Sequence, residues 1–250
     1  MDMIIFSGQS NMQGQTGVMP KPNEPVEGAW EYRWRTDELL PLRHPAGETI
    51  EPYLLAPHEG FGSLIPDFCR AYRALTGHEV LAVPAAKGAT CVDEWLPDTI
   101  RYSVMLNKIL AAEKYVSGIE HIYFVWLQGE SDALKFVPRE TYLERLIQLK
   151  NALKKDARIE KFGIIRVGYF AEVCSLPGDD EAIIQAQEDA VRQDDDFVML
   201  TRVTGELSRS SAYISSRFSG HFNNEAQKII GTLAGEALAR IALTKKETNS

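Results

Sequence analysis

Four short segments of the chain carry side chains suited to ester hydrolysis. They contain Ser10, Gly88, Gln128–Asp132 and His221, in that order. A serine hydroxyl is a weak nucleophile near neutral pH, so it needs an imidazole to accept its proton and a carboxylate to orient that imidazole. The oxyanion formed by its attack needs hydrogen-bond donors aimed at it. Ser10 and His221 therefore predict a nucleophile and its base.

The other parts of such a site are present in the same segments. We expect the backbone N–H groups of Ser10 and Gly88 and the side chain of Gln128 to form the oxyanion hole, since a glycine lets the backbone approach a ligand closely. Either Glu130 or Asp132 can supply the acid. Taken alone, Ser10 is equally suited to cap a helix, and the four segments together favour catalysis.

The surrounding pattern predicts an α/β sheet that places these segments together. Five short apolar runs predict buried strands: Met3–Phe6, Val80–Ala85, His121–Leu127, Phe162–Phe170 and Phe197–Val203. Apolar residues at helical spacing predict helices over Leu64–Leu75, Val104–Leu110, Pro138–Leu153 and from Asn223 onward. This alternation indicates a mostly parallel sheet with helices on both faces, which binds ligands at the carboxyl ends of its strands.

We expect one domain over residues 1–250, because no linker or repeat divides the chain. The stretch Gly14–Gly60 contains prolines and aromatic residues but shows no sustained period. Long irregular loops in compact domains usually serve function. We therefore interpret residues 14–60 as an irregular insertion on the substrate side.

The composition of the chain disfavours several classes of binding partner. The net charge of −8 gives no electrostatic reason to bind nucleic acid or an anionic membrane. Three widely spaced cysteines suggest neither a zinc site nor a disulfide framework, and the N-terminus shows no signal peptide, so we expect a cytoplasmic protein. The glycine-rich phosphate loops GxGxxG and GxxxxGK[ST] do not occur, which disfavours nucleotide binding.

The motifs carry a family resemblance over nearly the whole chain. Gly8-Gln9-Ser10-Asn11-Met12, Gly88-Ala89-Thr90 with Trp95, Gln128-Gly129-Glu130-Ser131-Asp132 and His221-Phe222-Asn223 resemble, in sequence and order, the sialate O-acetylesterase and acetyl xylan esterase group of SGNH hydrolases. The resemblance implies a flavodoxin-like three-layer αβα sandwich, no metal or other cofactor, and hydrolysis of acetyl esters through an acetyl-enzyme.

The resemblance also implies roles by position. Ser10 is then the nucleophile, His221 the base, and Gly88 and Gln128 part of the oxyanion hole. Substrate contacts are implied for Gln9, Asn11, Thr90 and Trp95.

One position departs from the superfamily pattern. Many members carry an aspartate three residues before the histidine, where this chain has Phe218. The resemblance then points to Glu130 as the acid that orients His221. Asp132, Glu206 or a Ser–His dyad without an acid remain alternatives.

The sequence thus predicts a serine esterase that removes acetyl groups from carbohydrates, such as acetylated xylo-oligosaccharides or sialic acids. Two other functions stay open. The first is an esterase acting on other small acyl esters. The second is a catalytically weak glycan-binding relative, which the missing aspartate motivates. Neither the sugar nor the oligomeric state follows from the sequence.

Overall fold

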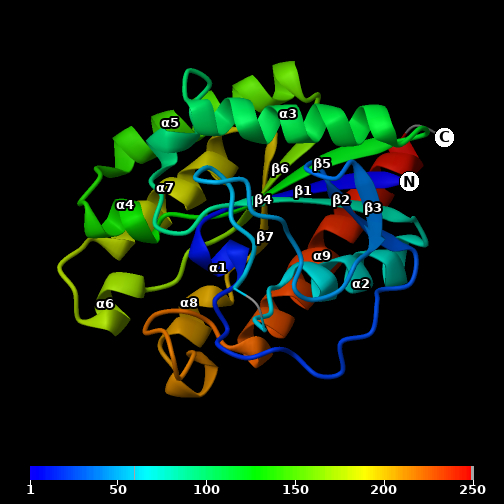
Figure 1. The fold of residues 1–250 in the computed structure, drawn as a ribbon. Coiled ribbons are helices and arrows are strands. Elements are labelled where there is room, and N and C mark those ends of the chain that lie inside the picture. Colours follow the sequence, from blue (N-terminus) through cyan, green and yellow to red (C-terminus); the bar gives the residue numbers. More distant parts are fainter. Residues whose placement is uncertain (59, 249–250) are drawn as a thin grey trace.

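The computed structural model describes residues 1–58 and 60–248 and shows a central sheet between two layers of helices (Figure 1). The strands are β1 (Asp2–Gly8), β2 (Ala29–Arg33), β3 (Glu38–Pro41), β4 (Val80–Ala86), β5 (His121–Leu127), β6 (Lys161–Ile165) and β7 (Phe197–Thr201). They lie in the order β3-β2-β4-β1-β5-β6-β7. Every pairing is parallel except that of β2 with β3.

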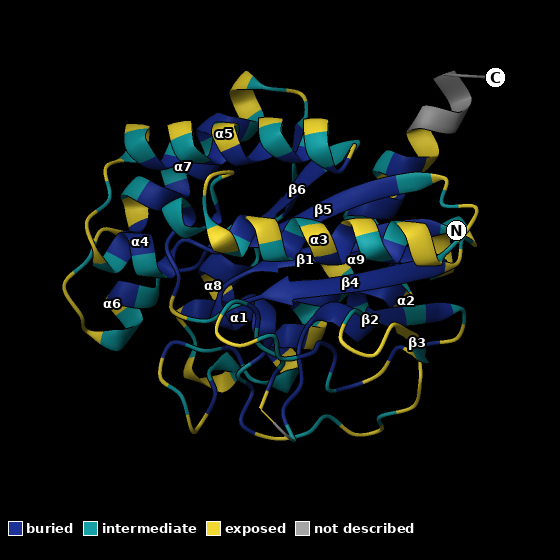
Figure 2. Ribbon diagram, turned by 45° about the horizontal axis from the view of Figure 1, so that its top comes forward, coloured by how far each residue is buried: buried dark blue, intermediate teal, exposed yellow. Residues whose placement is uncertain are grey.

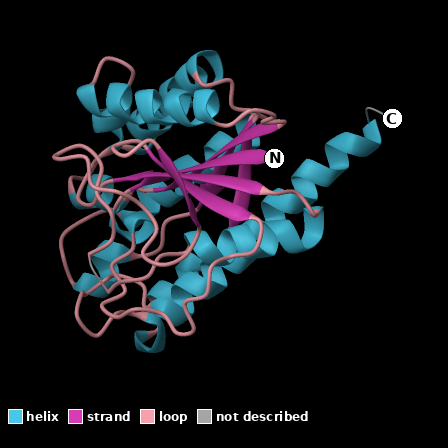
Figure 3. Ribbon diagram, turned by 45° about the vertical axis from the view of Figure 1, so that its right-hand side comes forward, coloured by secondary structure: helices cyan, strands magenta, loops and turns pink. Residues whose placement is uncertain are grey.

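The longer helices form the two outer layers, and short ones follow several strand ends (Figures 1 and 3). The longer helices are α2 (Ile65–Thr76), α3 (Ile100–Tyr115), α5 (Arg139–Asp156), α7 (Asp180–Gln193) and α9 (Asn224–Thr248). The short ones are α1 (Ser10–Gln13), η1 (Val92–Trp95), α4 (Glu130–Leu134), α6 (Phe170–Cys174), α8 (Thr204–Ser208) and η2 (Ser211–Tyr213). None of the described helices is both long enough and apolar enough to cross a bilayer.

The central strands are buried on both faces, which explains their continuous apolar runs (Figure 2). In β1, Met3 and Ile5 join the core beneath α3, α5 and α7, whereas Ile4 and Phe6 join the core beneath α2 and α9. The Phe6 ring meets Phe68 of α2 edge-on at 5.0 Å between centroids. The predicted three-layer αβα fold with a mostly parallel sheet is confirmed.

Two local predictions were wrong. The stretch Gly14–Gly60 is not wholly irregular, because it contains β2 and β3, and β2 extends the central sheet by pairing with β4. The predicted strand Phe162–Phe170 ends at Ile165, and Phe170 instead begins α6. The helix α7 was not predicted at all.

The close contact between α2 and α9 fixes the position of α9 relative to α2. Two glycines of α9, Gly231 and Gly235, face the backbone of α2 so closely that an added Cβ would lie 2.4 Å from the Leu64 carbonyl oxygen and 2.3 Å from that of Phe68. Backbone contact at this distance holds α9 in one position along α2. Residue 221, just before α9, is positioned by the same contact.

We expect Gly235→Ala to lower the free energy of unfolding by about 1–3 kcal/mol, because the added methyl group has no room beside Phe68. This loss exceeds the gain in helix propensity, about 1 kcal/mol. Urea denaturation followed by circular dichroism measures it. Arg240→Ala removes an exposed ion pair from the same helix and should change the value by less than about 0.5 kcal/mol. Equal effects of the two substitutions would contradict the close packing.

Candidate active site

The ends of β1, β4 and β5 meet at one edge of the sheet, and Ser10 follows the first of them. The chain turns sharply at Gly8, whose φ is +140° and whose Cα lies so close to β5 that a Cβ would be 2.0 Å from the Leu127 carbonyl oxygen. Only glycine fits there. Ser10 then begins α1 and is buried except for 8% of its surface, so its hydroxyl is held in one place.

His221 reaches this hydroxyl from the other end of the chain. Its Nε2 lies 2.8 Å from Ser10 Oγ, and its Nδ1 lies 2.9 Å from the carbonyl oxygen of Ser219. A carbonyl oxygen only accepts hydrogen bonds, so Nδ1 must carry the proton and donate it. Nε2 is then the unprotonated nitrogen, ready to accept the proton of Ser10.

The surroundings of His221 favour this neutral form. Burial lowers the pKa of His221 below its usual value, and the hydrogen bond to Ser219 offsets part of that effect. The rings of Phe170 and Phe218 stand edge-on to the imidazole, with centroids at 5.6 Å and 6.2 Å. Phe218 thus provides an apolar wall at the position where the resemblance led us to look for an aspartate.

Glu130 does not orient His221 in this structure. Its Oε1 accepts a hydrogen bond from Asn11 Nδ2 at 2.8 Å, while the Ser219 carbonyl occupies the position expected for an acid. Asn11 Oδ1 in turn accepts from the backbone N–H of Phe222 at 3.1 Å. Glu130 therefore supports the histidine segment only indirectly, through Asn11.

The other candidate acids also lie elsewhere. Asp132 is fully buried, accepts hydrogen bonds from Gln128 Nε2 and from the backbone N–H of Val92, and has its pKa raised by burial to about 6. Glu206 is exposed on α8. Burial likewise raises the pKa of Glu130, although the hydrogen bond from Asn11 opposes that rise. The arrangement at His221 is that of a Ser–His dyad supported by a backbone carbonyl.

The predicted oxyanion donors differ in availability. The N–H of Ser10 is at the first position of α1 and has no acceptor within that helix. The N–H of Gly88 donates to Gln13 Oε1 at 2.9 Å. Gln128 is fully buried, and its Nε2 contacts the Thr90 carbonyl at 2.8 Å, Gln9 Oε1 and Asp132. In this structure the amide nitrogen of Gln128 is therefore already engaged, and its predicted role in the oxyanion hole stays a prediction.

Of the four predicted substrate contacts, Gln9 borders the cavity beside Ser10. Thr90 and Trp95 are buried, and Trp95 Nε1 donates to Thr90 Oγ1 at 3.1 Å. Together they brace the loop that follows β4. Asn11 is also buried and acts by linking Glu130 to Phe222. Asn11, Thr90 and Trp95 do not border this cavity, and their predicted contact with substrate stays a prediction.

The cavity beside Ser10 and His221 has a volume of about 290 Å³. The bordering residues are Gln9, Ser10, Gln15, Gly88, Ala89, Glu130, Ser131, Leu134, Phe170, Phe218 and His221. Sequence reasoning missed Gln15, Leu134 and Phe170, since nothing in their spacing distinguishes them from loop or helix residues.

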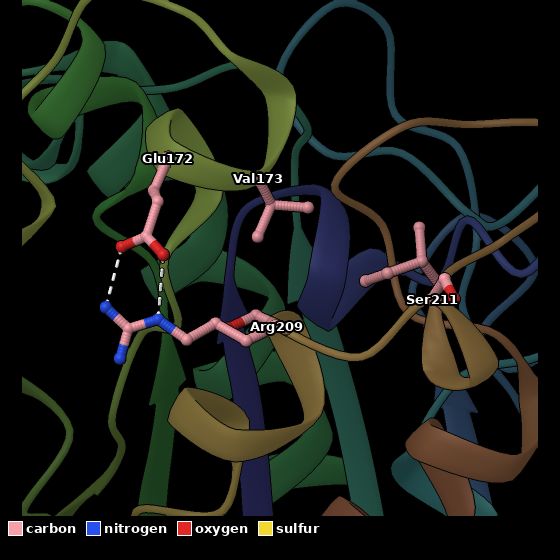
Figure 4. A pocket seen from close by; sticks show the side chains of 6 residues that line it. Glu172, Val173, Arg209 and Ser211 are labelled. Carbon is pink, nitrogen blue, oxygen red and sulfur yellow. Dashed lines mark hydrogen bonds and ion pairs between the residues drawn. The ribbon is translucent and has the colours of Figure 1, made fainter.

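A second hollow, of about 420 Å³, lies near α6 and α8 (Figure 4). Its charged groups satisfy each other, because Arg209 donates to both carboxylate oxygens of Glu172, at 2.9 Å and 2.6 Å. The Arg209 guanidinium also lies 3.4 Å from the centre of the Tyr169 ring. This hollow contains neither Ser10 nor His221, so we place the reaction in the first cavity.

Comparison with solved structures supports the fold. A protein from Arabidopsis thaliana superposes with a TM-score of 0.74 at 22% identity, covering 95% of this chain and 98% of that one. NanS has a TM-score of 0.70 at 15% identity, covering 99% and 98%. A carbohydrate acetylesterase from Xanthomonas citri has a TM-score of 0.56 at 12% identity, covering 96% of this chain and 57% of that one.

Sequence comparison identifies the family. A probable carbohydrate esterase of Arabidopsis thaliana is 27% identical over 188 residues, which are 66% of this chain and 67% of that protein. The family model of carbohydrate esterases described as sialic acid-specific acetylesterases matches residues 1–240. The predicted resemblance is confirmed, and the chain belongs to this family of carbohydrate esterases.

Proposed function

We propose that this protein is a serine esterase that hydrolyses O-acetyl esters on carbohydrates, with Ser10 as nucleophile and His221 as base. One observation carries the proposal: Ser10 Oγ lies 2.8 Å from His221 Nε2 at the wall of a cavity. This is the distance needed for proton transfer as the hydroxyl attacks. Membership of a carbohydrate esterase family supports the substrate class.

The reaction follows from this geometry. Ser10 Oγ bonds to the acetyl carbon as its proton passes to His221 Nε2, and the carbonyl electron pair moves onto oxygen. When the carbonyl re-forms, the bond to the sugar oxygen breaks, and that oxygen takes the proton from Nε2. Water then attacks the acetyl-enzyme by the same steps, releasing acetate and restoring Ser10.

The charge of the cavity favours a neutral acetylated sugar over sialic acid. Among the described residues that border it, none is a lysine or arginine, while Glu130 adds a carboxyl group. The carboxylate of a sialic acid would find no cationic partner there. Acetylated xylo-oligosaccharides carry no charge, and Phe170 and Phe218 border the cavity as aromatic residues of the kind that pack against sugars.

Ser10→Ala should lower kcat on para-nitrophenyl acetate and on acetylated xylo-oligosaccharide by about a thousandfold or more, because the nucleophile is lost. Acetate release measures the reaction, and thermal unfolding checks that the fold is kept. If wild type and variant are equally inactive, glycan binding without catalysis becomes the better account. If the wild-type protein hydrolyses esters of longer acyl chains faster than acetyl esters, an esterase acting on other acyl esters becomes the better account.

The pH profile should reflect the lowered pKa of His221. The base must be neutral, so activity falls as pH drops through that pKa. Because burial lowers it, we expect the acid limb of kcat/KM to have its midpoint below pH 6.5, the ordinary value for histidine. Initial rates in buffers of constant ionic strength measure this. A midpoint above the ordinary value would instead indicate a carboxylate facing the imidazole.

Glu130→Gln should lower kcat by less than about tenfold, because the amide oxygen can still accept the hydrogen bond from Asn11. If a carboxylate oriented the base directly, its loss would lower kcat by about 10⁴-fold. Glu130→Ala, which leaves Asn11 without its acceptor, is the matched comparison and should lose more. A loss from Glu130→Gln as large as that from Ser10→Ala would restore Glu130 as the acid.

A further inference from the structure

Gln9, the residue before Ser10, has its side-chain amide fixed in one orientation. Its Oε1 accepts hydrogen bonds from the backbone N–H of Ser131 at 3.1 Å, from Gln128 Nε2 at 3.2 Å and, more weakly, from the N–H of Gly129 at 3.5 Å. Donors surround this atom, so it must be the oxygen. The NH₂ group is therefore the end that points away from the β5 loop.

This NH₂ group is open to the cavity. Gln9 borders the cavity, and its Nε2 has no hydrogen-bond partner among the described residues. This nitrogen is not one of the fully buried polar atoms without a hydrogen-bond partner. Since it has no partner, it must be accessible to solvent. Gln9 itself is 97% buried, so two N–H donors are presented from a rigid side chain beside the nucleophile.

Most of the predicted oxyanion donors are already engaged in hydrogen bonds, so the site needs a further free N–H donor. Both hydrogens of Gln128 Nε2 are engaged with Thr90, Asp132 and Gln9, and Gly88 N–H is engaged with Gln13. A negative oxygen in a largely buried site is costly unless donors face it. Within the described residues, only Ser10 N–H remains from the expected set.

We propose that the side-chain amide of Gln9 donates a hydrogen bond to the oxyanion during hydrolysis, in place of Gln128. Gln128 then acts only indirectly, because its Nε2 donates to Gln9 Oε1 and so holds the Gln9 side chain in place. As Ser10 Oγ bonds to the acetyl carbon, the carbonyl pair moves onto oxygen and accepts from Gln9 Nε2. The amide keeps its proton throughout, and the pair returns when the sugar oxygen departs. This inference rests on the proposed esterase function.

Gln9→Glu separates donation from structural support. Its carboxylate can still accept from Ser131 and Gly129, but an oxygen replaces the NH₂ group and faces the developing charge. We expect kcat on para-nitrophenyl acetate to fall by about 10²–10³-fold, with KM changed less than about threefold. Rates are measured at about pH 8, where His221 is neutral in either protein. Because a carboxylate at this largely buried position costs stability, the thermal unfolding midpoint is measured for each variant and the rates are compared at a temperature where both proteins are folded.

Two further variants complete the test. Gln9→Ala removes both donor and acceptor and should lower kcat by about 10²-fold. Gln193→Glu adds the same charge at an exposed position ending α7 and should leave kcat unchanged.

The outcomes separate the inference from the function. If Gln9→Ala folds and keeps a kcat within about threefold of wild type, Gln9 does not donate to the oxyanion, and the inference is overturned while the esterase stands. If wild type releases no acetate, both fail.

Discussion

The hydrogen bond between Ser10 Oγ and His221 Nε2 is the interaction to which the rest of the site is fitted. It joins residues 211 positions apart, so its length depends on two packed elements rather than on a local turn. The close approach of Gly8 in β1 to Leu127 in the neighbouring strand β5 fixes the serine, and the contact of α9 with α2 fixes the segment that carries the histidine. A shift of either element by an ångström would break proton transfer.

His221 Nδ1 is hydrogen-bonded to the carbonyl dipole of Ser219 rather than to an ionised carboxylate. The Ser219 carbonyl selects the tautomer as well as a carboxylate would, since either accepts from Nδ1. It carries only a partial charge, so it stabilises the protonated imidazole less. With the rings of Phe170 and Phe218 packed against the imidazole, and burial lowering the pKa of His221, the site favours a neutral base. Glu130 contributes by tethering Asn11, which holds the backbone at Phe222.

Sequence reasoning located the segments that meet but not the direction of their side chains. The strands β1, β4 and β5 were predictable because burial on both faces demands continuous apolar runs. The pair β2 and β3 was not, since both are short and partly exposed. At the site, Ser10 and His221 do meet. Gln128 and Glu130 turn away because buried amide and carboxyl groups must find partners, and Thr90 and Asn11 supply them.

The separation of the pair along the chain has a consequence for biosynthesis. Translation produces Ser10 well before His221, and α9, which follows His221, is produced later still. A single domain generally folds as a unit. A nascent chain that lacks the segment from residue 221 onward therefore holds Ser10 without its hydrogen-bond partner. The pairing of Ser10 with His221 therefore forms only when α9 has docked against α2.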